Sequence, residues 1–325
     1  MKSIIEELTG IQKPEEKAVI EIVSNPLNEV KASYDIWCNI AKKVMPSRPI
    51  TELDSSQTIS IADQLYDVAL KLANDKMRGI SGSEILSFFK RRGRLTKEWS
   101  GLYLSAIMNK YYLDELVIDG IKGLAFIGYK LNHGYIRINS DTIDYIGAFA
   151  SNGMIENYGH IKNWFAEYAT GGIFVNDSLV GQEMGSNASG GVYVNNKDLM
   201  IDFGNNASGG IFINNGNSFQ MGTESLGGLF VNYTCILDFS GHDSLDGIFI
   251  TKEFPIHDSP FSKKNSITVN KNRLKKNKEL RAMLNSLELL TRGNIMNNGL
   301  EIRKLAALIE SNCTSKYSKK QAAKQ

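Results

Sequence analysis

Apolar residues in the first third of the chain recur every three or four positions, a spacing that predicts amphipathic α-helices. The clearest run begins at Pro26, a residue that suits the first turn of a helix, and continues to Val44. Further helices are expected at residues 60–74, 83–91 and 97–112. Thr96 is a candidate N-cap for the last of them. Residues 1–113 are therefore predicted to form an α-helical domain.

The helical spacing stops at about residue 114, and short Ile, Val and Phe runs then alternate with Gly, Asn, Ser and Asp up to residue 253. A repeat of 19 residues, with one interval of 18, is marked by Gly134, Gly153, Gly172, Gly191, Gly210, Gly228 and Gly247. A second series lies six residues earlier and is glycine except at Ala166. Each marker glycine precedes about three β-forming residues. This pattern predicts a right-handed parallel β-helix of about seven 19-residue coils over residues 114–253.

The repeated polar residues also have expected structural roles. The glycines are expected at corners that need positive φ or a close backbone approach. The asparagines that end the strands are expected to stack as a ladder: Asn157, Asn176, Asn195, Asn214 and Asn232. A leucine-rich repeat would need a regular L-x-x-L-x-L-x-x-N frame, and a calcium-binding β-roll would need a nine-residue period. Neither pattern is present, so both alternatives are disfavoured.

Alternation along the strands predicts which side chains are inside. The column expected inside contains Ile136, Ile155, Phe174, Tyr193, Phe212, Phe230 and Phe249. The flanking columns contain Arg137 and Glu156, which do not suit a dry core, but they become apolar from the third coil onward. An apolar outer sheet should be covered. We expect the chain's own C-terminal helices to cover it; a partner is the alternative, and the opposite orientation would expose the aromatic column instead.

Two apolar stripes at helical spacing predict a C-terminal helical hairpin over residues 273–312. The first stripe includes Leu284 and the second Ile302, with Gly293 and Gly299 between them. The other C-terminal segments are expected to be irregular: a basic linker at 254–272 and a disordered basic tail at 313–325.

The overall composition is that of an ordinary soluble protein, with 42% hydrophobic residues and a net charge of only +2. This balance predicts no global attraction to nucleic acid or to anionic membranes. The acidic N-terminal segment lacks the apolar core of a signal peptide, and no stretch approaches the roughly 18 apolar residues of a membrane span. The three cysteines show no pairing pattern, which suits a reducing compartment. We therefore expect a cytoplasmic protein without membrane association.

Three coils resemble the glycine-rich β-helix of glutamate synthase large subunits and of a formylmethanofuran dehydrogenase subunit. Those families repeat a G-x5-GG-x-[IV]-x-V unit with a similar period. The nearest stretches here begin at Gly185, Gly204 and Gly222 and read G-x4-GG followed by three apolar or aromatic residues. The resemblance covers residues 120–253 and departs at the strand end, where Asn replaces the usual Gly-Asn-Ala-Gly turn. In those families the domain joins subunits or shapes tunnels, while the chemistry lies elsewhere. The resemblance therefore implies a structural role.

The sequence contains no motif that predicts catalysis. His133, His160, His242 and His257 have no His or Cys at metal-ligand spacing. The nucleophile elbow, the Walker A loop and the strand–G-x-G-x-x-G–helix unit are missing from the sequence. Asp202 and Asp238 occupy loosely equivalent repeat positions, but solvated surface acids explain them. We predict no enzymatic activity, no metal, no cofactor and no small-molecule substrate.

Basic residues form two clusters that phosphate groups or acidic partners would favour. The first contains Lys90, Arg91, Arg92, Arg94 and Lys97, and the second includes Lys263, Lys264, Arg273, Lys275 and Lys276. A solvated linker and tail would explain them equally simply. The sequence favours a non-enzymatic scaffold that joins macromolecular partners, as a subunit or accessory factor of a complex. The alternatives are an RNA- or ribosome-associated factor and an accessory subunit of an oxidoreductase assembly.

Overall fold

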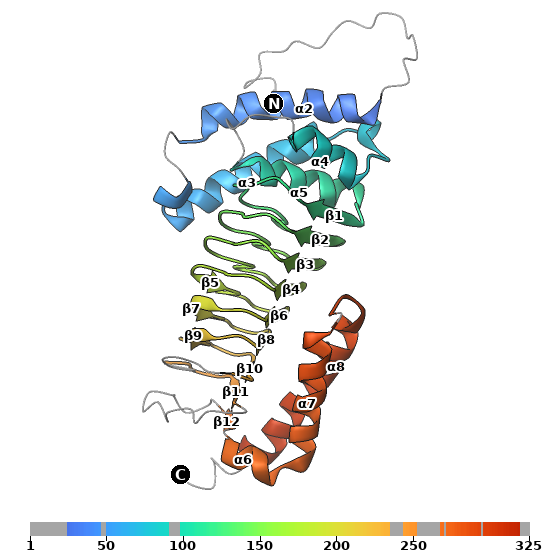
Figure 1. The fold of residues 1–325 in the computed structure, drawn as a ribbon. Helices are drawn as coiled ribbons and strands as arrows, with labels where there is room; N and C mark the ends of the chain where they lie inside the picture. The colour runs from blue at the N-terminus through green and yellow to red at the C-terminus, as the bar shows by residue number, and fades with distance from the viewer. Residues whose placement is uncertain are drawn as a thin grey trace, which may run out of the picture.

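The computed structural model describes residues 25–46, 50–90, 98–234, 243–251, 267–269, 271–293 and 295–318. Helices near the N-terminus sit on one end of a stack of parallel strands, and a helical hairpin lies along the side of that stack (Figure 1). The prediction of a parallel β-helix that follows an N-terminal helical domain and precedes C-terminal helices is confirmed. Among the described residues, no helix is both long and apolar enough to cross a membrane.

The N-terminal helices are α2 (Pro26–Val44), α3 (Ser55–Leu72), α4 (Gly82–Lys90) and α5 (Ser100–Tyr111), with short 3-10 turns at η1 (Ile50–Glu52) and η2 (Asp75–Met77). Asn25 caps α2, because its side chain accepts a hydrogen bond from the Leu27 N–H at 2.9 Å. Helix α3 begins earlier than predicted, because Asp54 caps it through the Gln57 N–H. Helix α5 begins later than predicted, and Thr96 lies outside the described residues.

These helices close the N-terminal end of the β-helix. Residues 100–109 of α5 are all buried. Gly101 lies so close to the first coil that a Cβ on it would stand 1.9 Å from the Ala125 carbonyl oxygen. The Tyr129 hydroxyl donates to Asp63 of α3 at 2.9 Å. One hydrophobic core therefore runs from Trp37 in the helical domain through the interior of the β-helix to Phe249.

The larger sheet contains nine strands among the described residues, all parallel to their neighbours. In spatial order they are β1 (Glu115–Ile118), β2 (Tyr135–Ile138), β3 (Met154–Asn157), β4 (Ile173–Asn176), β6 (Val192–Asn195), β8 (Ile211–Asn214), β10 (Leu229–Asn232), β11 (Ile248–Thr251) and β12 (Ile267–Val269). A smaller sheet contains β5 (Glu183–Met184), β7 (Leu199–Phe203) and β9 (Ser218–Met221). Strand β12 corrects the prediction of a linker over 254–272, because Ile267 pairs with Ile248 and adds another rung.

The interior follows the predicted column. Its aromatic rings stack from coil to coil, with centroids 4.6 Å apart for Tyr193 and Phe212 and 4.7 Å apart for Phe230 and Phe249. The predicted asparagine ladder is present, with side-chain hydrogen bonds of 2.7–2.9 Å from Asn157 to Asn232. All seven marker glycines have positive φ. A Cβ on Gly185, in the second series, would meet the Phe212 ring at 2.7 Å.

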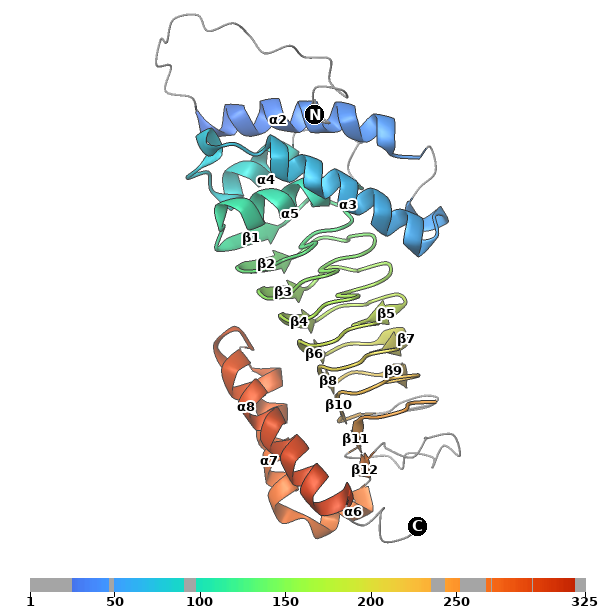
Figure 2. The same cartoon turned by 180° about the vertical axis from the view of Figure 1, so that it is seen from behind.

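The C-terminal helices are α6 (Lys271–Lys276), α7 (Lys278–Arg292) and α8 (Ile295–Cys313), followed by a π-helical turn, η4 (Thr314–Ser318). Helices α7 and α8 cover the outward apolar columns of the later strands, as predicted, and form a second hydrophobic core with them (Figure 2). The Tyr233 hydroxyl donates to the Leu284 carbonyl at 2.7 Å. Two expectations are corrected: Gly299 lies inside α8, and the tail predicted from 313 is still helical through Ser318 because Cys313 is buried in that core.

A candidate binding groove over the first strands

The hairpin leaves part of the outward face of the first strands accessible, although Tyr135 and Met154 on this face are buried in the core beneath the hairpin. Figures 1 and 2 both show the turn between α7 and α8 ending near β4, while β1–β3 lie between this turn and the helical domain. The strand register aligns Val117, Arg137, Glu156 and Val175 on successive strands of the outward face. Arg137 is exposed, and Val117 and Glu156 are half-buried. We call this outward face of β1–β3, together with its two helical walls, the groove.

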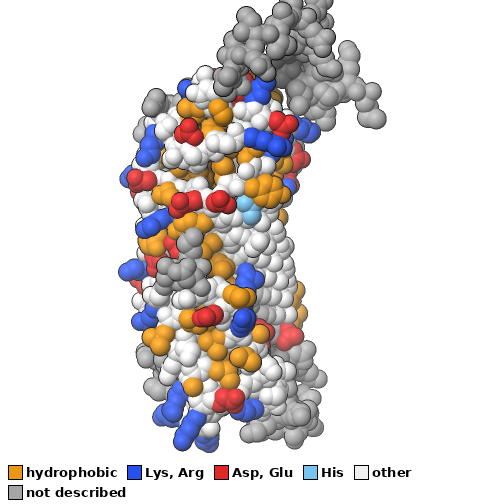
Figure 3. All heavy atoms as spheres, turned by 90° about the vertical axis from the view of Figure 1, so that its right-hand side faces the viewer, with side chains coloured by type: hydrophobic (Ala, Val, Ile, Leu, Met, Phe, Trp, Pro, Cys, Tyr) orange, Lys and Arg blue, Asp and Glu red, His pale blue; other side chains and the backbone are white. Residues whose placement is uncertain are grey.

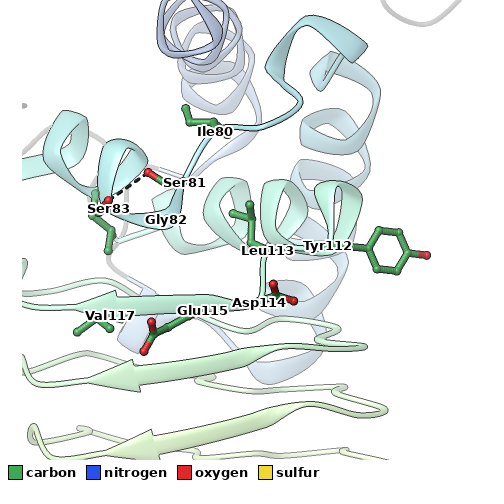
Figure 4. A pocket seen from close by; sticks show the side chains of 10 residues that line it. Ile80, Ser81, Gly82, Ser83, Tyr112, Leu113, Asp114, Glu115 and Val117 are labelled. Carbon is green, nitrogen blue, oxygen red and sulfur yellow. Dashed lines mark hydrogen bonds between the residues drawn. The ribbon is translucent and has the colours of Figure 1, made fainter.

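The first hollow of the groove lies against the N-terminal end of α4 and has a volume of about 430 Å³ (Figure 4). Glu115 and Val117 lie on the strand at its base, and Asp114 stands at the entry to that strand. The Tyr112 side chain projects away from the strands and is 72% exposed. Ser81 caps α4 in a capping box, because its backbone N–H donates to Glu84 at 2.9 Å. The first turn of α4, which forms the wall of this hollow, is therefore held in place by its cap.

The second hollow lies against the hairpin turn and has a volume of about 440 Å³. Its floor is a hydrogen-bonded group in which Glu156 accepts from the hydroxyls of Tyr135, at 2.6 Å, and Tyr158, at 3.3 Å. Burial and then the neighbouring Glu156 raise the pKa of Tyr135 well above its usual range, so that its hydroxyl remains a donor. The Arg137 guanidinium lies 4.7 Å from the centre of the Tyr158 ring. Ordered charged and aromatic groups thus face this hollow.

A second ladder ties the hairpin to the strands beside the groove. Asn215 donates to Asn196 at 2.8 Å, and Asn196 donates to Asp177 at 2.9 Å. Asn215 also donates to the Thr291 hydroxyl of α7 at 3.2 Å. The ladder ends on the Asp177 carboxylate, which lines the second hollow. The hairpin end of the groove is therefore fixed by polar contacts as well as by apolar packing.

The groove is acidic. Four carboxylates line the two hollows, against two guanidinium groups, which leaves a net charge of −2: Asp114, Glu115, Glu156 and Asp177 against Arg137 and Arg292. The Arg292 guanidinium already pairs with Glu288 at 3.1 Å. Acidic side chains are visible on this side of the molecule, below the helical domain (Figure 3).

The two predicted basic clusters are not brought together in the described part of the chain. Lys90 ends α4 beside Asp119, with 4.0 Å between nitrogen and oxygen. Arg273, Lys275 and Lys276 lie on α6, at the opposite end of the strand stack from α4 (Figure 1), and are exposed. The other predicted members lie outside the described residues: Arg91, Arg92, Arg94, Lys97, Lys263 and Lys264.

Three carboxyl groups are buried in the β-helix: Asp144 and Glu167 were not identified from the sequence, and Asp202 was expected to be a solvated surface acid, which is wrong. Burial is the main cause that raises the pKa of Asp144 and of Asp202 to about 6 and that of Glu167 to about 7. Asp238, the expected equivalent of Asp202, lies outside the described residues. Among the described residues, no group of three or more His, Cys, Asp or Glu side chains is placed to hold a metal ion. The sequence offered one signal for Glu167, its position directly after Ala166 of the second glycine series. This position lies at a coil corner, between two residues with positive φ, Ala166 and Tyr168.

Searches against protein-family models, curated proteins and solved structures give no match to this chain.

Proposed function

We propose that this protein is a non-enzymatic scaffold that holds a protein partner in the groove. One observation carries the proposal: the hairpin covers the outward face of the later strands and buries Tyr135 and Met154, but it leaves the outward column of Val117, Arg137 and Glu156 accessible, with charged groups held in place by hydrogen bonds. An open patch of ordered polar and aromatic groups is typical of recognition surfaces.

The rest of the molecule suits a rigid support. Nine parallel strands at about 4.8 Å spacing extend roughly 38 Å. Stacked rings fill the interior, and the asparagine ladder fixes one corner in every coil from Asn157 to Asn232. A partner in the groove would therefore be held at a fixed distance from α6, at the other end of the stack.

A protein partner suits the groove better than RNA does. Carboxylates in the groove would repel a phosphate backbone, whereas the predicted RNA contacts depend on lysine and arginine clusters. The described members of those clusters lie at opposite ends of the molecule. Among the described basic residues, an RNA-associated role would have to use those at one end alone.

Site-specific photo-crosslinking in the source organism tests the proposal. A photoreactive phenylalanine analogue at Arg137 is expected to form a discrete adduct with another protein. The same analogue at Lys162, which is also exposed but lies outside the groove, is the matched control. No adduct at residue 137, or the same adduct at both positions, would overturn the proposal. An adduct that ribonuclease removes would replace the protein partner with RNA.

A further inference from the structure

We infer that the partner segment in the groove is an amphipathic α-helix with a basic polar face. This inference depends on the proposed function and specifies the chemistry of the partner.

The groove continues a surface on which helices already pack. Val175 belongs to the core beneath the hairpin and also lines the second hollow, together with Ile295 of α8. Strands β1–β3 together are roughly 14 Å wide at the usual strand spacing, and Tyr135 and Met154 on this face are already buried. A helix with its side chains is about 10–12 Å across, so one helix lying along the strands would fill this width.

An added β-strand is a poorer fit than a helix. The N-terminal edge of the sheet is β1, and α4 covers it: a Cβ on Gly82 would stand 2.5 Å from the Glu115 carbonyl oxygen. A partner therefore meets the face of the sheet and not a free edge. Side-chain packing on a sheet face is the interaction that α7 and α8 make on the neighbouring strands.

The distribution of charge specifies the polar face of the helix. Asp114 and Glu115 lie at the wall formed by the helical domain, and Asp177 lies at the hairpin wall. Of the two guanidinium groups, Arg292 is paired with Glu288, and Arg137 lies over the Tyr158 ring. The half-buried Val117 offers apolar contact at the base of the first hollow. Lysine or arginine on both flanks of an apolar stripe would complement this arrangement.

Fluorescence anisotropy with the full-length protein tests the inference. The probes are two labelled model helices with the same leucine face, one with a lysine polar face and one with a glutamate polar face. The lysine peptide is expected to bind the protein at least about tenfold more tightly than the glutamate peptide. Equal affinities would overturn the inference.

Charge reversal locates the binding. The double variant Asp114→Lys, Glu115→Lys is expected to lose about tenfold in affinity for the lysine peptide and to gain affinity for the glutamate peptide. The control Asp198→Lys, Glu224→Lys makes the same charge change at exposed positions outside the groove and is expected to stay within about twofold. Because a misfolded variant would not gain binding, the gain excludes a folding defect. Equal effects of the two double variants would overturn the inference.

The two proposals can fail separately. A protein adduct at residue 137 without discrimination between the peptides would reject the basic helix and retain the scaffold. Failure of the adduct would reject the scaffold itself.

Discussion

Gly299 of α8 and Ile173 of β4 lie so close together that a Cβ on the glycine would stand 2.4 Å from Ile173 Cδ1. The absent side chain lets the helix approach the sheet where the hairpin begins to cover it. Arg303, one helical turn further along α8, donates to the Gly172 carbonyl at 3.1 Å and fixes the same approach. These contacts fix the position of α8 over β4, beside the groove.

Two substitutions at Gly299 should therefore distinguish the effect of helix propensity from the effect of packing α8 against the sheet. Gly299→Ala is expected to change the free energy of unfolding by less than about 1 kcal/mol, because the gain in helix propensity offsets a small shift of the flexible Ile173 end. Gly299→Leu is expected to lower the free energy of unfolding by about 2–3 kcal/mol and to increase amide hydrogen exchange in α8. Urea unfolding and hydrogen exchange check both values. Similar effects of alanine and leucine would contradict the close approach.

The buried asparagine ladder, which includes Asn195, should contribute more to the stability of the fold than the second ladder, which includes Asn196. Asn195 accepts from Asn176 at 2.9 Å and donates to Asn214 at 2.7 Å, with no exposed surface. Asn195→Ala leaves these buried partners unsatisfied, so we expect a loss of about 2–4 kcal/mol in unfolding free energy.

The neighbouring Asn196→Ala provides the matched control for the ladder. Asn196 is half-exposed, so water can replace its bonds to Asp177 and Asn215, and we expect a loss below about 1 kcal/mol. Chemical denaturation of the two variants measures the difference. Comparable losses would show that the buried ladder contributes no more than surface hydrogen bonds do.

The repeat made most of the β-helix predictable. A period of 19 places equivalent residues on top of one another, so one correct assignment of Phe174 as internal extends to every coil. The cover over the outer columns could be predicted because the apolar columns of the sheet and the apolar stripes of the C-terminal helices both have to be buried, and they can bury one another. Strand β12 was missed, although Ile267 lies 19 residues after Ile248, because the segment before it lacks the marker glycine.

The groove could not be predicted to the same degree. The sequence did identify Arg137 and Glu156 as outward-facing, and the structure places both in the groove. The position of the hairpin turn, however, depends on contacts between residues far apart in the chain, such as Arg303 and Gly172. No local sequence pattern encodes how far along the sheet the hairpin extends.

The second glycine series allows backbone strain to be tested in both directions, by replacing its one alanine with glycine and one of its glycines with alanine. Ala166 stands in this series with φ +59°, a left-handed conformation that costs alanine about 1 kcal/mol, so Ala166→Gly is expected to change stability only slightly or to raise it. Gly185→Ala adds a Cβ in the same conformation against the rings of Phe212 and Tyr193 and is expected to cost about 2–4 kcal/mol. Thermal unfolding of the two variants checks the contrast, which would be wrong if both were neutral.

Glu167 should make the stability of the protein depend on pH. Its side chain is only 4% exposed, and burial, followed by the charge of Glu183, raises its pKa to about 7. The folded protein therefore binds a proton that the unfolded chain releases between about pH 4.5 and pH 7. Stability from this group is fully present below pH 4.5 and is lost as the pH rises through 7. Asp144 and Asp202, whose pKa values rise to about 6, act in the same direction.

The isosteric substitution Glu167→Gln isolates this contribution. It removes the ionisation and can still accept the hydrogen bond from Asn187, so we expect the variant to be more stable than the wild type at pH 8, by up to about 3 kcal/mol, and nearly equal at pH 4.5. Denaturant unfolding at several pH values measures the two slopes. Glu301→Gln, at an exposed position of α8, is the control and should leave the slope unchanged. Parallel curves for Glu167→Gln and the wild type would show that Glu167 ionises in the folded protein as it does in the unfolded chain.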